Sequence, residues 1–381
     1  MLTKMRLLAI AALALGVSMV LAACGGGGGV ESGGANGEVQ TVQLQGKPSG
    51  ELTISNWPLY IDRQTVPDFE QATGVQVKYI EDVNDNAEFF GKMQPLLSKG
   101  ESGGRSIFVV TDWMAKKMYD LGYLQNLDKS GIPNVEQNLV PNLQHPSFDP
   151  NRDFSVPWQS GMTGLIVRTD LTTGVKSICD LFDDPKLKGK VDMLTEMRDT
   201  VPLVMKCMGV DLANATEDDW MAAIDKIEQA ADSGQIRRFT GNDYARDLTS
   251  GDAAAVIGWS GDAIQLQSSN PNIKFVMPEE GCMLWSDNMV IPVGAPNPTA
   301  AEAWMNYAYV PGHQAQITEY NYYVSPVSGV KEILQKIDPT AAKSQLIFPS
   351  DSFTKDCDTA PTLTGEEEQR VTQAFDAVVS G

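Results

Sequence analysis

Histidine is scarce in this chain of 381 residues: only His145 and His313 occur, far apart and without metal-ligand spacing. No Cys-x-x-Cys pair is present either, so we expect no metal site and no cofactor. Two distant histidines do not support a Ser-His-Asp triad, and the sequence contains neither a G-x-S-x-G motif nor a P-loop. These absences argue against the hydrolases and nucleotide-dependent enzymes that such motifs define.

Positive charge is also in short supply. The chain has 29 lysines and arginines against 49 aspartates and glutamates, which gives a net charge of −20. Lys4 and Arg6 are the charged residues of segment 1–24, so removing that segment lowers the net charge from −20 to −22. A field of this sign repels nucleic acid and attracts cations, although it does not report on the fold. We therefore do not expect a nucleic-acid partner.

Beyond the N-terminus, no apolar run approaches the length of a membrane-spanning helix. At the N-terminus, Lys4 and Arg6 precede an apolar run that starts at Leu7 and closes with "LAAC", a pattern typical of a secretory signal over residues 1–23. This ending resembles the lipobox of bacterial lipoproteins, which implies cleavage before Cys24 and attachment of lipid to its sulfur. Secretion with an unmodified Cys24 is the alternative. We expect a lipid-anchored protein outside the cytoplasm, in a periplasmic space or on the outer face of the cell membrane.

Residues 24–48 are rich in glycine and small polar residues and have no apolar period. Such a stretch does not bury enough apolar surface to become ordered, so we expect a flexible tether after the lipidated cysteine. About 330 residues follow it, a length that suits two domains.

Four cysteines remain when Cys24 is set aside as the lipid site. An exported protein meets an oxidising compartment, where four cysteines form two disulfides with three possible connectivities. The sequence does not choose among these connectivities. Our preference is to pair Cys179 with Cys207 and Cys282 with Cys357.

Strands alternate with helices along the rest of the chain, which predicts an α/β fold with a largely parallel sheet. In the first half we expect strands over 51–57, 75–82 and 105–112 and helices over 61–73, 86–100 and 113–124. A strand within 154–171 is a candidate hinge between the two halves. Later expected strands include 251–259, 273–281 and a run that begins at Met289. Thr216 and Asp219 form an approximate capping box at the start of a helix.

Two short stretches place a tryptophan just before an aspartate: Trp259 with Asp262 in "GWSGDAIQ", and Trp285 with Asp287 in "LWSDNMVIP". In open α/β sheets, ligands bind beyond the carboxyl ends of the strands. Five residues fall at or just after expected strand ends, and we expect them to converge on one cleft: Trp57, Asp112, Glu196, Asp262 and Asp287.

Carboxylates hold ammonium groups through charge-assisted hydrogen bonds, and aromatic faces pack on methylenes and attract cations. The candidates are Asp112, Glu196, Asp199, Asp262, Asp287, Trp57, Tyr60, Trp113, Trp259, Trp285 and Tyr323. Taken singly, each acid also suits a solvated loop and each aromatic also suits a core, where we place Trp220 and Trp304. The repeated position at strand ends favours a pocket for an organic cation.

Two other interpretations, a glycosidase acid pair and a ferric-iron site, fit parts of the sequence. Glu196 and Asp199 resemble a glycosidase acid pair, but three residues apart near a helix start they lie on one side of a ligand, whereas glycoside hydrolysis needs carboxylates that flank the bond. The run "YNYY", residues 320–323, contains adjacent tyrosines of the kind that ligate ferric iron, but no partner histidine is apparent and indoles have no part in metal coordination.

Nine stretches in the expected order resemble the periplasmic spermidine- and putrescine-binding proteins of bacterial ABC importers, over about residues 50–381. They are "ISNWPLYI", "FVVTDWMAKKM", "LGYLQNLDKSGIPN", "FDPNRDFSVPWQSGMTGLIV", "LFDDPKLKGKV", "LTEMRDTV", "LTSGDAAAVIGWSGDA", "PEEGCMLWSDNMVIP" and "NYYVSP". The run from "RRFTGNDY" through "GWSGDA" is closer to the putrescine-type branch.

The resemblance implies an α/β, two-lobed periplasmic-binding-protein fold of type II, with a ligand cleft between the lobes. One lobe would comprise 49–162 with 286–332, and the other 163–285 with 333–381. The ligand-binding positions that match by motif are Trp57, Tyr60, Thr111, Trp113, Glu196, Asp199, Trp259, Asp262, Trp285, Asp287 and Tyr323. Asp112 stands where the family usually has a small hydroxyl or neutral residue, and it adds negative charge to the same pocket.

These observations predict a monomeric, lipid-anchored solute-binding protein, not an enzyme, that captures putrescine or spermidine and passes it to the permease subunits of an ABC transporter. A different cationic or amine nutrient, or ferric iron, is the alternative ligand. A secreted carbohydrate-active enzyme is the rival from another class.

Overall fold

The computed structural model describes residues 48–381. The expected signal segment 1–23, Cys24 and all but the last residue of the tether 24–48 lie outside this range. Within the described residues, no helix has the length and apolar character needed to cross a membrane.

The first part of the chain alternates strands and helices as the sequence predicts. It contains β1 (Glu51–Asn56), α1 (Thr65–Thr73), β2 (Gln76–Glu81), α2 (Asn86–Leu97), β3 (Ile107–Thr111), α3 (Asp112–Asp120) and α4 (Pro133–Asn138). Gly74 ends α1 in the left-handed conformation, with φ of 81°, which glycine adopts without a steric penalty. The side chain of Asp85 caps α2 by accepting the Glu88 amide, so the strand-to-helix turn before α2 is locally encoded.

The second part continues the alternation and ends in helices. Its elements are β4 (Val156–Arg168), α5 (Asp180–Asp183), β5 (Val191–Leu194), α6 (Met197–Cys207), α7 (Glu217–Asp232), β6 (Ile236–Thr240), α8 (Tyr244–Ser250), β7 (Ala255–Trp259), α9 (Ser260–Ser269), β8 (Ile273–Val276), β9 (Met283–Val290), α10 (Pro298–Ala308), α11 (Pro311–Asn321), α12 (Val330–Ile337) and α13 (Gly365–Ser380). The expected capping box of Thr216 and Asp219 forms at the start of α7. Trp220 and Trp304 are buried in the core, as predicted.

One sheet runs through the molecule in the order β2-β1-β3-β9-β4-β7-β5-β6, with β8 paired to β4. The prediction of a largely parallel sheet is wrong at its centre. Both ends are parallel, but β9 runs antiparallel to β3 and β4, and β4 runs antiparallel to β7 and β8. The reason is that β4 and β9 carry the chain in opposite directions between the two halves, and neither is reached by a strand–helix–strand crossover within its half.

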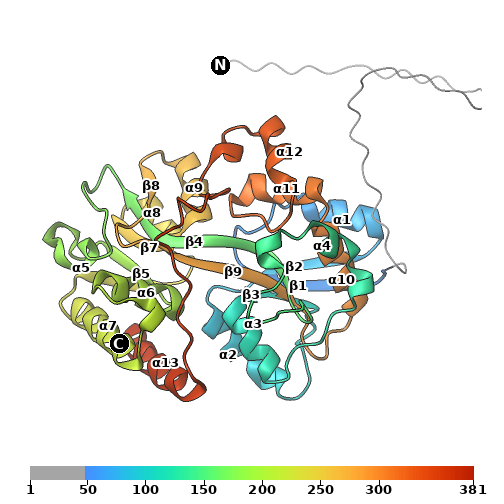
Figure 1. The fold of residues 1–381 in the computed structure, drawn as a ribbon, viewed down its shortest axis with the longest axis horizontal. Helices are drawn as coiled ribbons and strands as arrows, with labels where there is room; N and C mark the ends of the chain where they lie inside the picture. Colours follow the sequence, from blue (N-terminus) through green and yellow to red (C-terminus); the bar gives the residue numbers. More distant parts are fainter. Residues whose placement is uncertain (1–47) are drawn as a thin grey trace, which may run out of the picture. The chain divides into compact units, whose positions relative to one another are not determined.

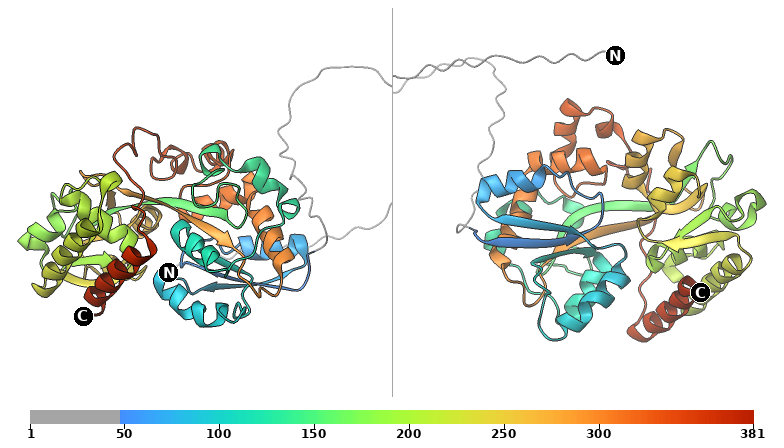
Figure 2. Two further views of the ribbon diagram at one scale, coloured as in Figure 1. Left: turned by 60° about the horizontal axis from the view of Figure 1, so that its bottom comes forward. Right: turned by 180° about the vertical axis from the view of Figure 1, so that it is seen from behind.

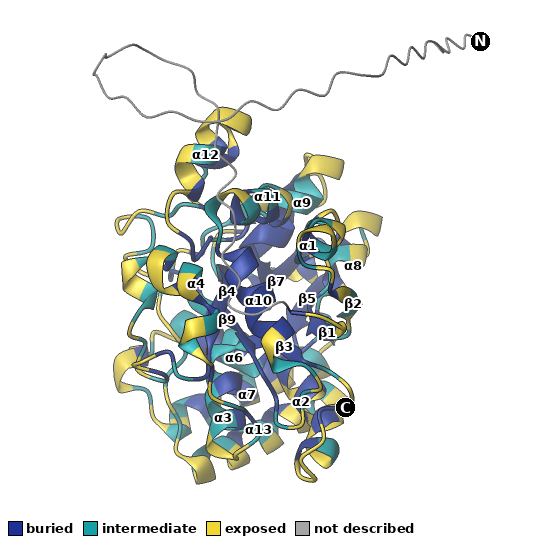
Figure 3. Cartoon of the chain, turned by 90° about the vertical axis from the view of Figure 1, so that its right-hand side faces the viewer, coloured by how far each residue is buried: buried dark blue, intermediate teal, exposed yellow. Residues whose placement is uncertain are grey.

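Figure 1 shows β4 and β9 side by side in the middle, with β1–β3 toward one end and β5–β7 toward the other. This arrangement confirms the predicted two-lobed α/β fold, whose lobes share the two long strands. The lobe boundaries expected from the sequence, 162/163 and 285/286, fall inside β4 and β9; as exact limits they stay a prediction. The final helix α13 returns to pack on α7 (Figure 2). Figure 3 shows buried strands at the centre and helices with exposed outer faces, as amphipathic helices over a shared core require.

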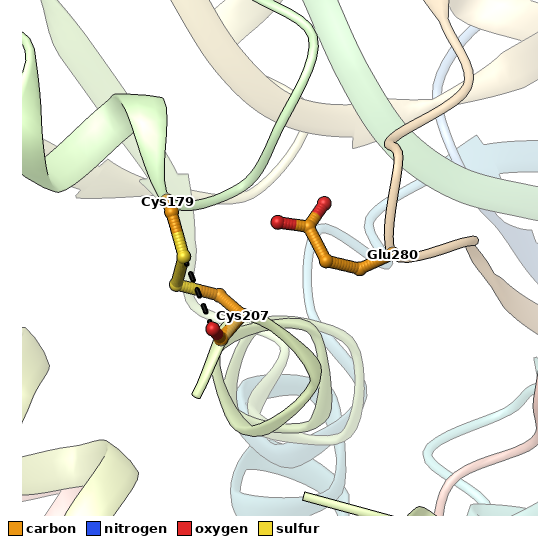
Figure 4. A group of neighbouring side chains, drawn as sticks. All are labelled: Cys179, Cys207 and Glu280. Atoms are coloured by element: carbon orange, nitrogen blue, oxygen red, sulfur yellow. Dashed lines mark hydrogen bonds between the residues drawn. A yellow bond between two sulfur atoms is a disulfide. The ribbon is translucent and has the colours of Figure 1, made fainter. Parts of the chain in front are cut away.

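The two disulfides have the preferred connectivity, Cys179–Cys207 and Cys282–Cys357. Glu280 lies near the first of them (Figure 4). Because the two sulfurs are bonded to each other they are not thiolate ligands. The Glu280 carboxylate instead accepts hydrogen bonds from the Ser177 hydroxyl and the Ile178 amide. This cluster therefore ties the β8–β9 connection to the segment before α5.

Candidate functional site

A cavity of about 1320 Å³ is lined by residues from both lobes. Its lining includes every residue that the sequence nominated: Trp57, Tyr60, Thr111, Asp112, Trp113, Glu196, Asp199, Trp259, Asp262, Trp285, Asp287 and Tyr323. These residues span 267 positions of the chain, so only the fold brings them together.

Most of these residues lie at or just after the end of a strand, as expected. Trp57 follows β1, Glu196 follows β5, and Asp262 lies in the first turn of α9 after β7. Asp287 departs from this pattern, because β9 starts at Met283 and not near Met289, so Asp287 lies inside a strand. It reaches the cavity through pairing: the antiparallel register sets Asp287 opposite Thr111, the last residue of β3.

Asp287 is 4% exposed and holds two hydrogen bonds. The Thr111 hydroxyl donates to Oδ1 over 2.7 Å, and the Tyr60 phenol donates to Oδ2 over 2.9 Å. Burial raises the pKa of Asp287 to about 7, and the charges of Asp112 and Asp199 add to this rise. Each carboxylate oxygen keeps a further acceptor site, which a cationic ligand can use.

Glu196 is buried at the start of α6. Its Oε1 accepts from the backbone amide of Asn86 at 2.5 Å and from the Asn86 side-chain amide at 2.9 Å. Burial raises the pKa of Glu196 well above its usual value, and the neighbouring charges of Asp85 and Asp199 act in the same direction. An approaching cation would relieve both the desolvation and the repulsion between these acids.

Asp199 and Asp112 are two further acids of the cavity, and their pKa values are raised to about 6, in both cases chiefly by burial. Trp259 donates its indole N–H to Asp199 over 2.9 Å, so the ring and the acid fix each other's orientation. Asp112 accepts from the amide of Trp113 over 2.7 Å. The positive charge of Arg198 partly opposes the rise in the pKa of Asp112.

Asp262 differs from the other acids in how fully its oxygens are occupied. Tyr323 donates to one oxygen over 2.6 Å, while Tyr244 and Asn242 donate to the other over 2.7 and 3.0 Å. Burial still raises the pKa of Asp262, although these three donors oppose the rise. Its shortest contacts therefore orient Tyr323, which lines the cavity, and the buried Tyr244.

Aromatic rings form the remaining walls. Trp57 and Trp259 meet edge to face with centroids 5.6 Å apart, and Tyr60 and Tyr323 do so at 4.9 Å. Trp285 packs against its cross-strand partner Gly161, where an added Cβ would lie 2.4 Å from the ring. The glycine is thus required for the indole to occupy its place.

Several lining residues were not nominated from the sequence. Asn86 bridges Glu196 and Thr111, Arg198 places its guanidinium over the Trp113 ring at 4.9 Å, and Glu368 joins Arg198 to Lys117 by 3.4 Å ion pairs. A signal existed for Arg198, which stands between Glu196 and Asp199 in "LTEMRDTV". No sequence motif near Glu368 indicates a binding site. Glu368 lines the cavity because α13, the last helix, folds back beside it.

The geometry bears on both alternative interpretations, the glycosidase acid pair and the ferric-iron site. Glu196 and Asp199 lie on the same wall, with Asn86 and Trp259 occupying part of their acceptor capacity. In the "YNYY" run, Tyr323 is buried and donates to Asp262, whereas Tyr320 is 36% exposed, so their phenols do not converge.

A two-lobed α/β fold with a cavity lined by residues of both lobes defines the class of binding proteins that enclose a small ligand. The family model for bacterial extracellular solute-binding proteins matches residues 64–347, and the chain belongs to this family. The family is one of solute-binding proteins, which confirms the expectation that this protein is not an enzyme.

The chain is similar to several characterised relatives. It is 30% identical over 295 residues to the putrescine-binding periplasmic protein PotF of Escherichia coli, covering 72% of this chain and 77% of that protein. It is 25% identical over 300 residues to the spermidine/putrescine-binding periplasmic protein of the same organism, covering 78% and 83%. Among solved structures, a spermidine/putrescine ABC transporter protein from Listeria monocytogenes superposes with a TM-score of 0.77 at 26% identity, covering 86% of this chain and 98% of that one.

Proposed function

We propose that this protein captures a polyamine, putrescine or spermidine, in the central cavity and delivers it to an ABC importer. The observation that carries the proposal is the pairing of buried carboxylates with indole walls in one cavity. A polyamine has the complementary chemistry, since it offers ammonium donors separated by apolar methylenes. The names of the relatives described above agree with this ligand class.

The acids of the cavity have different roles in ligand recognition. Asp287, Glu196 and Asp199 hold the ammonium groups, because the first two are buried, Asp199 is half-buried, and each keeps unused acceptor sites. Trp57, Trp259 and Trp285 line the cavity, pack on the methylenes and attract the charge through their faces, worth about 0.5–2 kcal/mol each. Asp262 acts indirectly by orienting Tyr323.

Capture proceeds by binding and lobe closure without bond making. Closure removes water from the cavity, so the carboxylate–ammonium attraction acts in a lower effective dielectric than in solution. The cation also restores the ionised state of acids whose pKa values burial has raised. Release to a permease needs a closed state favoured by only a few kcal/mol.

The N-terminal pattern supports a place for this activity outside the cytoplasm, with Cys24 as the lipid attachment site. A membrane-anchored monomer would keep the captured ligand close to the permease. Mass spectrometry of the detergent-extracted protein tests this part: a diacylglyceryl group on Cys24 and loss of residues 1–23 are expected, and an unmodified Cys24 contradicts it.

Isothermal titration calorimetry tests the ligand. We expect saturable heat with putrescine or spermidine at low salt and none with a panel of neutral sugars. If agmatine or another cationic nutrient binds and putrescine and spermidine do not, the protein is a solute-binding protein with a different ligand from the one proposed. Sugar turnover with no amine binding would overturn the proposal.

A further inference from the structure

Three consecutive residues at the start of α2, Asn84 to Asn86, bind two loops that belong to the opposite end of the sheet. Asn86 donates twice to Glu196, as described above. The Thr195 hydroxyl donates to Asp85 over 2.9 Å, and the Asn242 amide donates to the Asn84 side-chain oxygen over 3.1 Å.

The two partner loops lie across the cleft from α2. Helix α2 follows β2, whereas Thr195 follows β5 and Asn242 follows β6. In the strand order, β2 is one edge of the sheet, and β5 and β6 are at the other. These hydrogen bonds therefore join the two lobes and do not stabilise either lobe alone.

Gly241 shows how closely the lobes approach here. A Cβ at this position would lie 2.3 Å from the backbone oxygen of Asn84 and 2.6 Å from its side-chain nitrogen. Its backbone does not have the positive φ that favours glycine. Glycine is thus needed at 241 for the contact with Asn84 and not for the local turn.

Asn86 also connects Glu196 and Asp287, two buried acids of the cavity, through Thr111. Its side-chain amide donates to Glu196 over 2.9 Å and to the Thr111 hydroxyl over 2.8 Å, and Thr111 donates to Asp287. Its side-chain oxygen accepts the Thr111 amide over 3.1 Å. Since three hydrogen bonds of 2.9, 2.8 and 2.7 Å join Glu196 to Asp287, their bonded oxygens are at most about 8.4 Å apart.

We propose that Asn84–Asn86 is an interlobe clasp whose formation against Thr195, Glu196 and Gly241–Asn242 positions Glu196 for the ligand. Asn86 is a positioning residue, because it acts on the ligand through Glu196 and Thr111. The site is then complete only when the lobes are closed, which couples ligand affinity to contacts that the ligand does not touch. The ligand named in the test rests on the proposed function; the clasp itself does not.

The test compares Gly241→Ala with Gly91→Ala, a matched control on α2 where an added Cβ meets nothing within 4 Å. Gly241 is not part of the cavity lining, so its side chain does not contact the ligand. We expect Gly241→Ala to raise the apparent Kd for putrescine at least ~10-fold, because overpacking disfavours the closed state. Asn84→Ala should weaken binding in the same direction. The melting temperature of the ligand-free variants should stay within about 2 °C of wild type, since each lobe is intact.

Hydrogen exchange separates this proposal from the identity of the ligand. Putrescine should slow exchange of the Asn86 and Asn242 amides in wild type and in Gly91→Ala, and much less in Gly241→Ala. If wild type binds neither putrescine nor spermidine, the proposed function fails. The clasp is then tested in the ligand-free proteins. Faster exchange of the Asn86 and Asn242 amides in Gly241→Ala than in Gly91→Ala supports the clasp. Equal exchange, or wild-type affinity in Gly241→Ala, overturns it.

Discussion

The phenol of Tyr60 donates a 2.9 Å hydrogen bond to the carboxylate of Asp287, 227 positions away in the sequence. Burial and the adjacent acid raise the pKa of Tyr60 well above its usual value, so the phenol remains a neutral donor at physiological pH. It stabilises the anionic carboxylate without neutralising it. Asp287 is thereby held in one orientation, and its ionised form offers the charge that a cationic ligand needs.

Replacing Asp287 by Asn should abolish most polyamine binding. The amide keeps the shape of the side chain but removes the charge, and losing one partner of a buried charged pair costs about 2–5 kcal/mol, or roughly 30- to 5000-fold in Kd. Calorimetry with putrescine measures the change.

The matched control for this change is Asp218→Asn, an exposed acid on α7. It should leave affinity unchanged within about twofold. The ligand-free Asp287→Asn protein should be at least as stable as wild type, because it no longer buries a carboxylate. Wild-type affinity in Asp287→Asn would contradict the assignment of this residue.

Affinity should rise with pH between 5.5 and 8 and then level off. In the absence of a cation the pKa of Asp287 is about 7 and those of Asp199 and Asp112 are about 6, so acidification protonates the groups that hold ammonium. Binding near pH 7 should release protons, which calorimetry in buffers of different ionisation enthalpy detects. A pH-independent Kd over this range would contradict the roles of all three acids.

The stability of the ligand-free protein should respond with the opposite sign. An acid whose folded pKa lies above its unfolded value binds more protons when folded, so its contribution to the free energy of unfolding falls as pH rises from about 4 to 7. The difference in this slope between wild type and Asp287→Asn, measured by thermal unfolding, isolates the contribution of Asp287. An identical slope in the two proteins would show that Asp287 has an ordinary pKa.

The sequence predicted which residues line the cavity better than it predicted how the fold brings them together. Strand ends can be recognised locally, so Trp57, Glu196 and Asp262 were found by position. Asp287 lines the cavity for a different structural reason than the expected one, because the antiparallel pairing of β9 with β3 is a long-range property. Asn86 was missed, since its partners Glu196 and Thr111 come from other elements and a local helix-start pattern does not reveal them.

Adding a methyl group at Gly161 should weaken binding without touching the ligand. Its Cβ would lie 2.4 Å from the Trp285 ring, so Gly161→Ala forces the indole out of its place in the cavity wall. We expect a ~10-fold or greater loss of putrescine affinity, comparable in direction to Trp285→Ala. Gly312→Ala is the control, since an added Cβ there meets nothing within 4 Å. Unchanged affinity in Gly161→Ala would mean that the position of Trp285 is not critical.

The two disulfides should differ in their effect on binding. Cys357 is bonded to Cys282 at the start of β9, and Asp358 continues this attachment through backbone hydrogen bonds to Cys282 and Leu284. The next residues, from Thr359 to Leu363, contribute to the cavity lining, whereas Cys179 and Cys207 do not.

Replacing both Cys282 and Cys357 by Ser should therefore lower stability and affinity together. A sequence separation of 75 residues corresponds to about 4.5 kcal/mol of loop entropy, and measured losses run to about 2–5 kcal/mol. The corresponding Cys179→Ser/Cys207→Ser variant spans 28 residues and should lose stability, by about 3.6 kcal/mol on the same basis, with putrescine affinity retained. Thermal unfolding and calorimetry on the two variants give both quantities, and equal affinity in the two would show that the 359–363 segment keeps its position without the Cys282–Cys357 bond.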